Sequence, residues 1–163
     1  MDMLLGLAQA LHDTPLSQAL RASLWLYPLV NTGHLLGMAL LFGAIVVLDL
    51  RLNGLWRPVP AAPLAQVLVP VAACGLALAL ATGALLFSTR PTDYLHEPLF
   101  GAKLALLAVA GLNIALLHRA RGWPGRSGEW PADPLPLPWR LAGRVSALCW
   151  LGVIVLGRLI GYR

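Results

Sequence analysis

Four long apolar segments constrain this chain more than any other feature of its sequence. They lie at about residues 24–50, 64–87, 99–118 and 141–162, and each is close to the length at which a helix crosses the hydrocarbon core of a bilayer. Because that core offers no water to backbone amides, such segments cross it as helices. The sequence therefore predicts an all-α fold, a single four-helix transmembrane bundle that takes up residues 1–163.

The first 22 residues predict a short amphipathic helix that lies on the membrane surface. Its apolar residues recur at helical spacing: Met3, Leu4, Leu7 and Leu11. The run Asp13-Thr14-Pro15 then provides a cap and a start signal for the segment that follows. This helix would lie beside the bundle without crossing the membrane.

Composition excludes a soluble globular protein, since 58% of the residues are apolar and only 12% are charged. The net charge of +5 does not indicate nucleic-acid binding, because the basic residues lie mostly at the ends of the apolar segments. At such positions they set topology and meet anionic headgroups. We therefore expect the lipid bilayer, and no nucleic acid, as a partner.

The distribution of basic residues predicts the orientation. With the N-terminus outside, the inner side holds seven: Arg51, Arg57, Arg119, Arg121, Arg126, Arg140 and Arg144. The outer side then holds five: Arg21, Arg90, Lys103, Arg158 and Arg163. Because basic residues concentrate on the cytoplasmic side, we expect a multi-pass protein of the bacterial inner membrane with both termini in the periplasm.

The first crossing segment carries the strongest functional candidate, His34. Asn31, Met38 and Asp49 share its helical face, and polar groups on such a face point toward protein. Burying an imidazole near the middle of a bilayer is costly without a partner. Three interpretations remain open: His34 ligates a haem iron, it joins Met38 in a Cu(I) site, or it hydrogen-bonds a neighbouring helix.

Two cations near the outer interface extend this candidate site. Lys103 and Arg158 share a depth on different helices, and His34 lies about 9 Å deeper by the rise of a helix. They would hold haem propionates, an anionic substrate or a quinone headgroup. The alternative is that they pair with Asp93 and Glu97 or reach lipid phosphate.

His118 is the second histidine within a crossing segment. By helical rise, His34 and His118 lie about 15 Å and about 28 Å from the outer face, so one iron cannot take both from one chain. A haem would need one histidine alone, a ligand from His12 or His96, or a second copy of the chain. His118 is either part of a cofactor site or an interfacial histidine near the C-terminal dipole of its helix.

Other features predict structural roles. Asp49 has Arg51, Arg57 and Arg144 as possible ionic partners, and a buried carboxylate needs at least one of them. Small residues at helical spacing allow close helix packing: Gly33, Gly37, Gly75, Ala79 and Gly83. The proline-rich connection at residues 119–139 is expected to be extended, as a surface loop or a docking strap. No nucleophile elbow, P-loop or HExxH motif appears, so enzymatic activity stays undecided.

Several short segments carry a resemblance. They are W-L-Y-P (25–28), H-L-L-G-M-A-L-L-F-G (34–43), D-L-R-L-N-G (49–54), F-G-A-K-L (100–104), A-G-L-N (110–113) and G-R-L-I (157–160). Together they resemble a family of small bacterial four-helix membrane proteins of unassigned activity. The H-x-x-G-x-A-L-x-x-G run is more distantly similar to membrane proteins of the copper-resistance protein D type and to b-type cytochrome membrane domains. The first of these likenesses implies metal passage, and the second implies haem and quinone.

The leading functional hypothesis is a haem- or quinone-binding electron-transfer component, alone or as a subunit of a larger membrane complex. Haem b would take His34 as its ligand, with Lys103, Arg158, Asn31 and His118 as further candidates. One alternative is a copper-handling protein that uses His34 and Met38. Another is a non-catalytic subunit or homo-oligomer that packs against its partners through the small-residue stripes.

Overall fold

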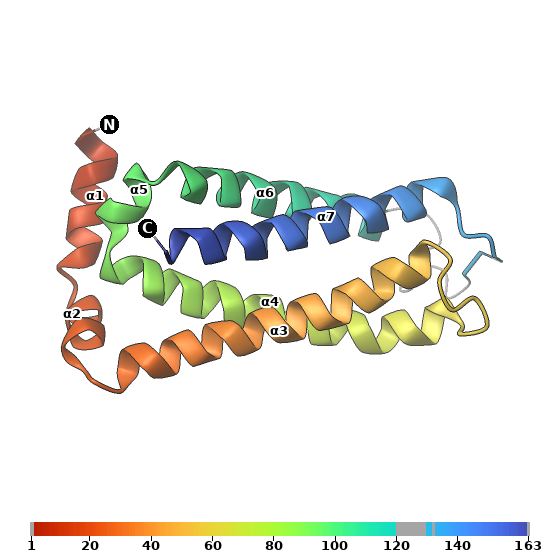
Figure 1. Cartoon of the computed structure of the whole chain (residues 1–163), viewed down its shortest axis with the longest axis horizontal. Helices are drawn as coiled ribbons and strands as arrows, with labels where there is room; N and C mark the ends of the chain where they lie inside the picture. The colour runs from red at the N-terminus through yellow and green to blue at the C-terminus, as the bar shows by residue number, and fades with distance from the viewer. Residues whose placement is uncertain (1, 120–129, 132, 163) are drawn as a thin grey trace.

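The computed structural model describes residues 2–119, 130–131 and 133–162. Within them the chain forms seven α-helices and no strand, which confirms the predicted all-α fold. The helices are α1 (Asp2–His12), α2 (Pro15–Ala22), α3 (Leu26–Leu52), α4 (Ala61–Thr89), α5 (Pro91–His96), α6 (Pro98–Arg119) and α7 (Leu137–Ile160). Figure 1 shows the four longest helices running lengthwise, with α1, α2 and α5 at one end, which we call the cap end.

The helices α3, α4, α6 and α7 are each long and apolar enough to cross a membrane. Their boundaries agree with the predicted crossings to within about four residues. Many large apolar side chains on them point outward; Leu35, Leu80, Leu112 and Leu148 are all more than half exposed. Such a surface is stable only against lipid. The chain is therefore a multi-pass membrane protein in contact with the bilayer.

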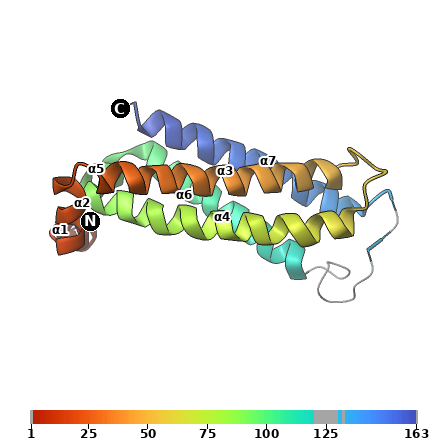
Figure 2. The ribbon, with the colours of Figure 1, turned by 90° about the horizontal axis from the view of Figure 1, so that it is seen from below.

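The bundle consists of two helical hairpins. Helix α3 packs along α4, α6 packs along α7, and α3 also contacts α7. Among the described residues, the backbones of α4 and α6 do not come close, although their side chains meet near the cap end, where Phe87 of α4 stacks on Phe100 of α6. Figures 1 and 2 show the α3–α4 pair on one side and the α6–α7 pair on the other. The hairpins are thus joined mainly through α3 and α7, and the side where α4 faces α6 has no close backbone contact.

The α3–α4 contact depends on two glycines. A Cβ added to Gly37 would lie 2.6 Å from the backbone nitrogen of Ala79, and one added to Gly75 would lie 2.5 Å from that of Leu41. Real side chains do not approach backbone so closely. The glycines therefore let the two backbones meet, as small residues do in membrane helix pairs. The hypothesis that they pack against partner subunits is wrong for these two positions, because the contact lies within the chain.

The buried core lies in the middle of the bundle and at the end opposite α1, which we call the strap end. The central cluster joins α3, α4, α6 and α7: Leu41, Ala44, Ala72, Ala110, Cys149 and Trp150. The cluster at the strap end is formed by Leu48, Leu52, Ala61, Ala65, Leu135 and Trp139. Nearer the cap end, three half-buried aromatic rings from α4, α5 and α6 pack together: Phe87, Tyr94 and Phe100.

The strap end is fastened by Arg51. Its guanidinium forms two hydrogen bonds with the Asp133 carboxylate, at 2.6 and 3.2 Å, and its Nε donates to the carbonyl of Val59 at 2.6 Å. Leu135 and Trp139 are buried beside it. The described part of the proline-rich connection therefore packs on the bundle as a strap. Arg121 and Arg126 of this connection, and Arg163, lie outside the described residues.

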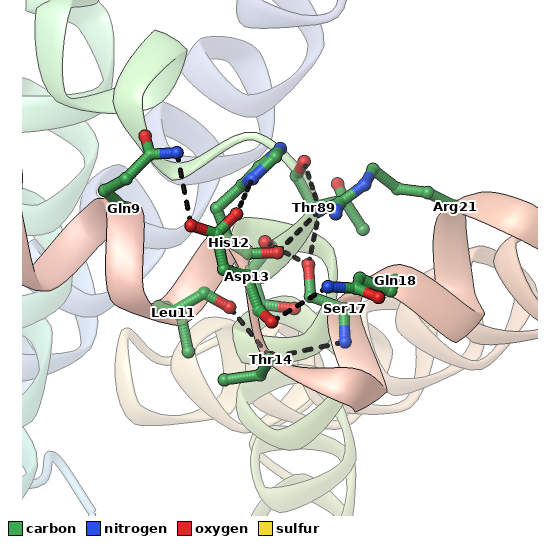
Figure 3. A network of polar contacts seen from close by, with 10 residues as sticks. Gln9, Leu11, His12, Asp13, Thr14, Ser17, Gln18, Arg21 and Thr89 are labelled. Atoms are coloured by element: carbon green, nitrogen blue, oxygen red, sulfur yellow. Dashed lines mark hydrogen bonds and ion pairs between the residues drawn. The ribbon is translucent and has the colours of Figure 1, made fainter.

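At the cap end, polar contacts join α2 to the end of α4 (Figure 3). The predicted cap is confirmed, since the Thr14 hydroxyl accepts a hydrogen bond from the backbone of Ser17 at 3.3 Å. The fully buried Ser17 hydroxyl donates to the carbonyl of Ser88 at 2.6 Å and accepts from Arg21 at 2.7 Å. Arg21 also donates to the carbonyl of His12. These bonds hold the N-terminal segment across the bundle end.

The N-terminal segment forms two helices, α1 and α2, where the sequence predicted one helix over residues 1–22. The break falls at Asp13 and Thr14, where the capping signal lies, because a cap ends one helix as it begins the next. Met3, Leu7 and Leu16 are more than half exposed. These apolar side chains fit a segment lying on the membrane surface.

Candidate functional sites

His34 lies in the half of α3 nearer the cap end and points its ring at α4. Its Nδ1 is 2.9 Å from the carbonyl oxygen of Ala79 and 3.2 Å from the hydroxyl of Thr82. A carbonyl only accepts, so Nδ1 carries the hydrogen and donates it. In the neutral ring the lone pair then resides on Nε2, to which no described atom hydrogen-bonds. The structure therefore fixes one tautomer of His34 and leaves Nε2 available.

The small residues of α4 make room for this ring. A Cβ added to Gly83 would lie 3.1 Å from Cε1 of His34, so a larger residue there would push the imidazole away. Thr82 uses its own hydroxyl to bond the carbonyl of Leu78, one turn earlier in α4. The predicted hydrogen bond between His34 and a neighbouring helix is confirmed. It engages one ring nitrogen only, which leaves the ligand hypotheses open.

Lys103 lies partly buried on α6 and crosses to α7. Its Nζ would be 3.4 Å from a Cβ added to Gly157, so the ammonium lies over that glycine. No described residue pairs with it or accepts a hydrogen bond from it, and it lies close enough to His34 for an electrostatic interaction. The predicted alternative, a pair with Asp93 or Glu97, is not formed in the described part of the chain.

Arg158 does not join this group. It is exposed, and its guanidinium lies 4.6 Å from the centre of the Tyr162 ring and donates to the Tyr162 hydroxyl at 2.6 Å. The structure therefore gives Arg158 a partner four residues along the chain, just beyond the end of α7. Asn31 is exposed near the start of α3, and Met38, one turn beyond His34, is half-buried. The copper hypothesis, which depends on Met38, stays a prediction.

Asp49, in the strap half of α3, has no ionic partner among the described residues, although it is only 3% exposed. The prediction that it pairs with an arginine is wrong. Arg51 pairs with Asp133, and Arg144 donates to the side chain of Asn53 at 2.8 Å. Asn53 in turn donates to the backbone carbonyl of Asp49, not to its carboxylate. The neighbouring cations are therefore all directed elsewhere.

A cavity of about 140 Å³ lies beside Asp49. Its wall is mostly aliphatic, with side chains from α3, α4 and α6. Four polar residues also line it: Asp49, Asn113, His118 and Ser146. Asn113 donates to the carbonyl of Ala142 at 3.0 Å, while Oδ2 of Asp49 and Oγ of Ser146 are buried without a hydrogen-bond partner. The cavity thus brings two buried polar side chains, Asp49 and Ser146, close together in an apolar surround without a hydrogen bond of good geometry among the described residues.

The two histidines of the crossing helices lie in different parts of the bundle. His118 lines the Asp49 cavity and is exposed, with Nδ1 2.9 Å from the carbonyl of Ile114. Asp49 follows His34 by 15 residues on α3, about 22 Å along a helix. The expectation that His34 and His118 do not share one iron agrees with this separation. His118 therefore belongs with Asp49, a grouping that the sequence analysis missed.

Within the described ranges, no group of three His, Cys, Asp or Glu side chains lies close enough together to hold a metal ion. The one signal for the Asp49 cavity in the sequence is an acidic residue inside an apolar segment, and its environment depends on which helices meet.

The resemblances to known families that short segments suggest stay predictions. The chain matches no protein-family model, no curated protein and no solved structure.

Proposed function

We propose that this membrane protein binds haem b in the half of the bundle nearer the cap end and serves in electron transfer, with Nε2 of His34 as the iron ligand. The tautomer of His34 is the observation that carries the proposal. Histidines that ligate metals commonly donate the other ring hydrogen to a carbonyl, which orients the ring and makes it a better ligand. The bond from Nδ1 of His34 to the Ala79 carbonyl is of this kind.

Lys103 supplies the second element of the site. A partly buried ammonium without a partner among the described residues favours a carboxylate ligand such as a haem propionate, because the ion pair offsets its lost hydration. Helix α7 carries Gly157 beneath this ammonium, and the missing side chain lets the ammonium lie close against α7. The buried aliphatic clusters lie in the middle and strap regions, while the cap end holds the aromatic rings of Phe87, Tyr94 and Phe100. A cofactor near His34 and Lys103 would add to the packing of this half.

Absorption spectra test the proposal directly. The full chain is expressed with added haem precursor, purified in detergent and measured before and after dithionite. We expect a Soret band that shifts on reduction, a stoichiometric haem content, and loss of most of that haem in His34→Ala. The width of the visible bands reports whether a second ligand, such as His34 of a second copy, completes the iron site.

His96→Ala is the matched control, because His96 is exposed on α5 and bonds its own helix. It should keep the parent spectrum, and Lys103→Gln should release haem faster than the parent does. A colourless parent protein would overturn the proposal. Equal haem content in His34→Ala and His96→Ala would overturn the assignment of the ligand.

A further inference from the structure

A second site lies in the strap half of the bundle, apart from the proposed haem site. The Asp49 cavity is bounded by α3, α4, α6 and α7, and its volume of about 140 Å³ is close to that of an engineered protein cavity that binds benzene. Its walls are almost entirely apolar, contributed by residues such as Leu41, Ile45 and Leu76. It is therefore large enough for one small ring.

Two buried polar side chains face this apolar space. Asp49 is 3% exposed and Ser146 is 5% exposed, and both line the cavity. They lie close enough to interact with each other, but in the described part of the chain neither Oδ2 of Asp49 nor Oγ of Ser146 forms a hydrogen bond of good geometry. A buried carboxylate oxygen and a buried hydroxyl without partners are each costly. A ligand that donates hydrogen bonds to them would remove that cost.

The cavity reaches the surface between α4 and α6. Both helices line it, Ala73 from α4 and His118 from α6 are exposed, and in the described part of the chain no close backbone approach of α4 and α6 closes this side. A membrane-dissolved molecule would therefore enter sideways from the bilayer. Such a molecule needs an apolar body to partition into lipid.

We propose that this cavity binds a small organic ammonium compound, with an apolar body of about one six-membered ring and its charged head on Asp49 and Ser146. The lone carboxylate selects a cation over an anion. One carboxylate is too few for Ca²⁺, which takes six to eight oxygen ligands, and the apolar wall favours the organic body over a hydrated ion. Water alone would find few of the polar partners it needs.

Binding of two isosteric probes tests this inference. 4-Fluorobenzylamine and 4-fluorobenzyl alcohol have similar size, and only the amine is charged. Each is titrated into the detergent-purified full chain and followed by ¹⁹F NMR. We expect the amine to bind about tenfold more tightly than the alcohol, because its charged hydrogen bond to Asp49 is the stronger one. Asp49→Asn should abolish this preference.

A second pair of variants tests the proposal even if the Asp49 variant does not fold. Ala73→Leu places a larger side chain at the mouth and should weaken amine binding severalfold. Ala77→Leu, one turn along α4, is equally exposed and does not line the cavity, so it should bind as the parent does. Equal affinity for amine and alcohol in the parent, no binding of the amine, or unchanged binding in Ala73→Leu would each overturn the proposal. Haem content plays no part in this readout.

Discussion

At the residue scale, the environment of a polar side chain in this bundle depends on the neighbour that the helix pairing supplies. His34 and Asp49 lie on the same helix, in comparable apolar stretches of sequence. Helix α4 supplies a carbonyl to His34, whereas the carboxylate Oδ2 of Asp49 is left without a partner beside a cavity. Both residues are expected functional positions by the rule that intramembrane ionisable groups are rare and costly.

Single glycines also determine how closely α3 and α4 can pack. We expect Gly37→Ala to destabilise the protein by about 1–3 kcal/mol, because its Cβ would lie 2.6 Å from the Ala79 backbone and force α3 and α4 apart. Thermal denaturation in detergent, followed by circular dichroism, measures the change. Gly43→Ala on the same helix is the control, since no neighbouring atom lies within 4 Å of its added Cβ. Equal melting temperatures for the two variants would contradict this account of the contact.

At the element scale, the described part of the strap and the segment α1–α2 fasten opposite ends of the bundle. The strap uses an ion pair between Arg51 and Asp133, while α2 uses hydroxyl and guanidinium bonds to the last turn of α4. Arg51 is almost completely buried, at 2% exposed. A buried guanidinium that loses its carboxylate is destabilising, so the strap depends on Asp133 remaining ionised.

This dependence predicts an effect of pH. Hydrogen bonds from Arg51 hold the pKa of Asp133 below its ordinary value, so the pair stabilises the folded state at neutral pH and loses this contribution as pH falls through the lowered pKa. We expect Asp133→Asn to melt at a lower temperature than the parent near pH 7, and the difference to shrink toward about pH 3. Asp93→Asn, an exposed carboxylate near the cap end, is the control. A difference that stays constant with pH would rule out the ion pair as the cause.

At the scale of the whole molecule, four crossings place both chain ends on the same side of the membrane. Figure 1 shows the N-terminus and the C-terminus at the cap end, with the α3–α4 connection at the strap end. The cap end also carries α1 and α2, whose exposed apolar side chains suit the membrane surface. In the described part of the chain, the two hairpins meet along α3 and α7, and the Asp49 cavity is lined by α4 and α6 on the side where their backbones stay apart.

The orientation predicted from the basic residues is open to a direct test. If the strap end faces the cytoplasm, a bacterial alkaline phosphatase fused after residue 163 should be active, and green fluorescent protein at the same position should be dark. The same reporters inserted in the α3–α4 connection, at residue 56, should give the opposite pattern. A fluorescent C-terminal fusion with inactive phosphatase would reverse the predicted topology.

Local patterns in the amino-acid sequence are enough to predict the class of the protein and its long helices. Segments of about 20 apolar residues must form helices in a bilayer, and the Thr14 cap lies where the N-terminal segment breaks, because both signals are local. The sequence predicted the capping residues but only one N-terminal helix where the structure has two, and it did not predict α5. Local signals therefore predicted the four crossing helices, with errors of a few residues at their ends.

Which side chains meet depends on how the helices pack, and local patterns do not predict it. Arg51 is two residues from Asp49 in the chain, yet its guanidinium bonds Asp133, 82 positions away, because the strap folds back over the end of α3. The glycines of α3 and α4 fit each other for a similar reason, and the Asp49 cavity lies where the backbones of α4 and α6 stay apart. A hydropathy pattern specifies that a helix is buried in lipid, but the relative rotation and spacing of helices set its polar partners, and those arise from packing across the whole bundle.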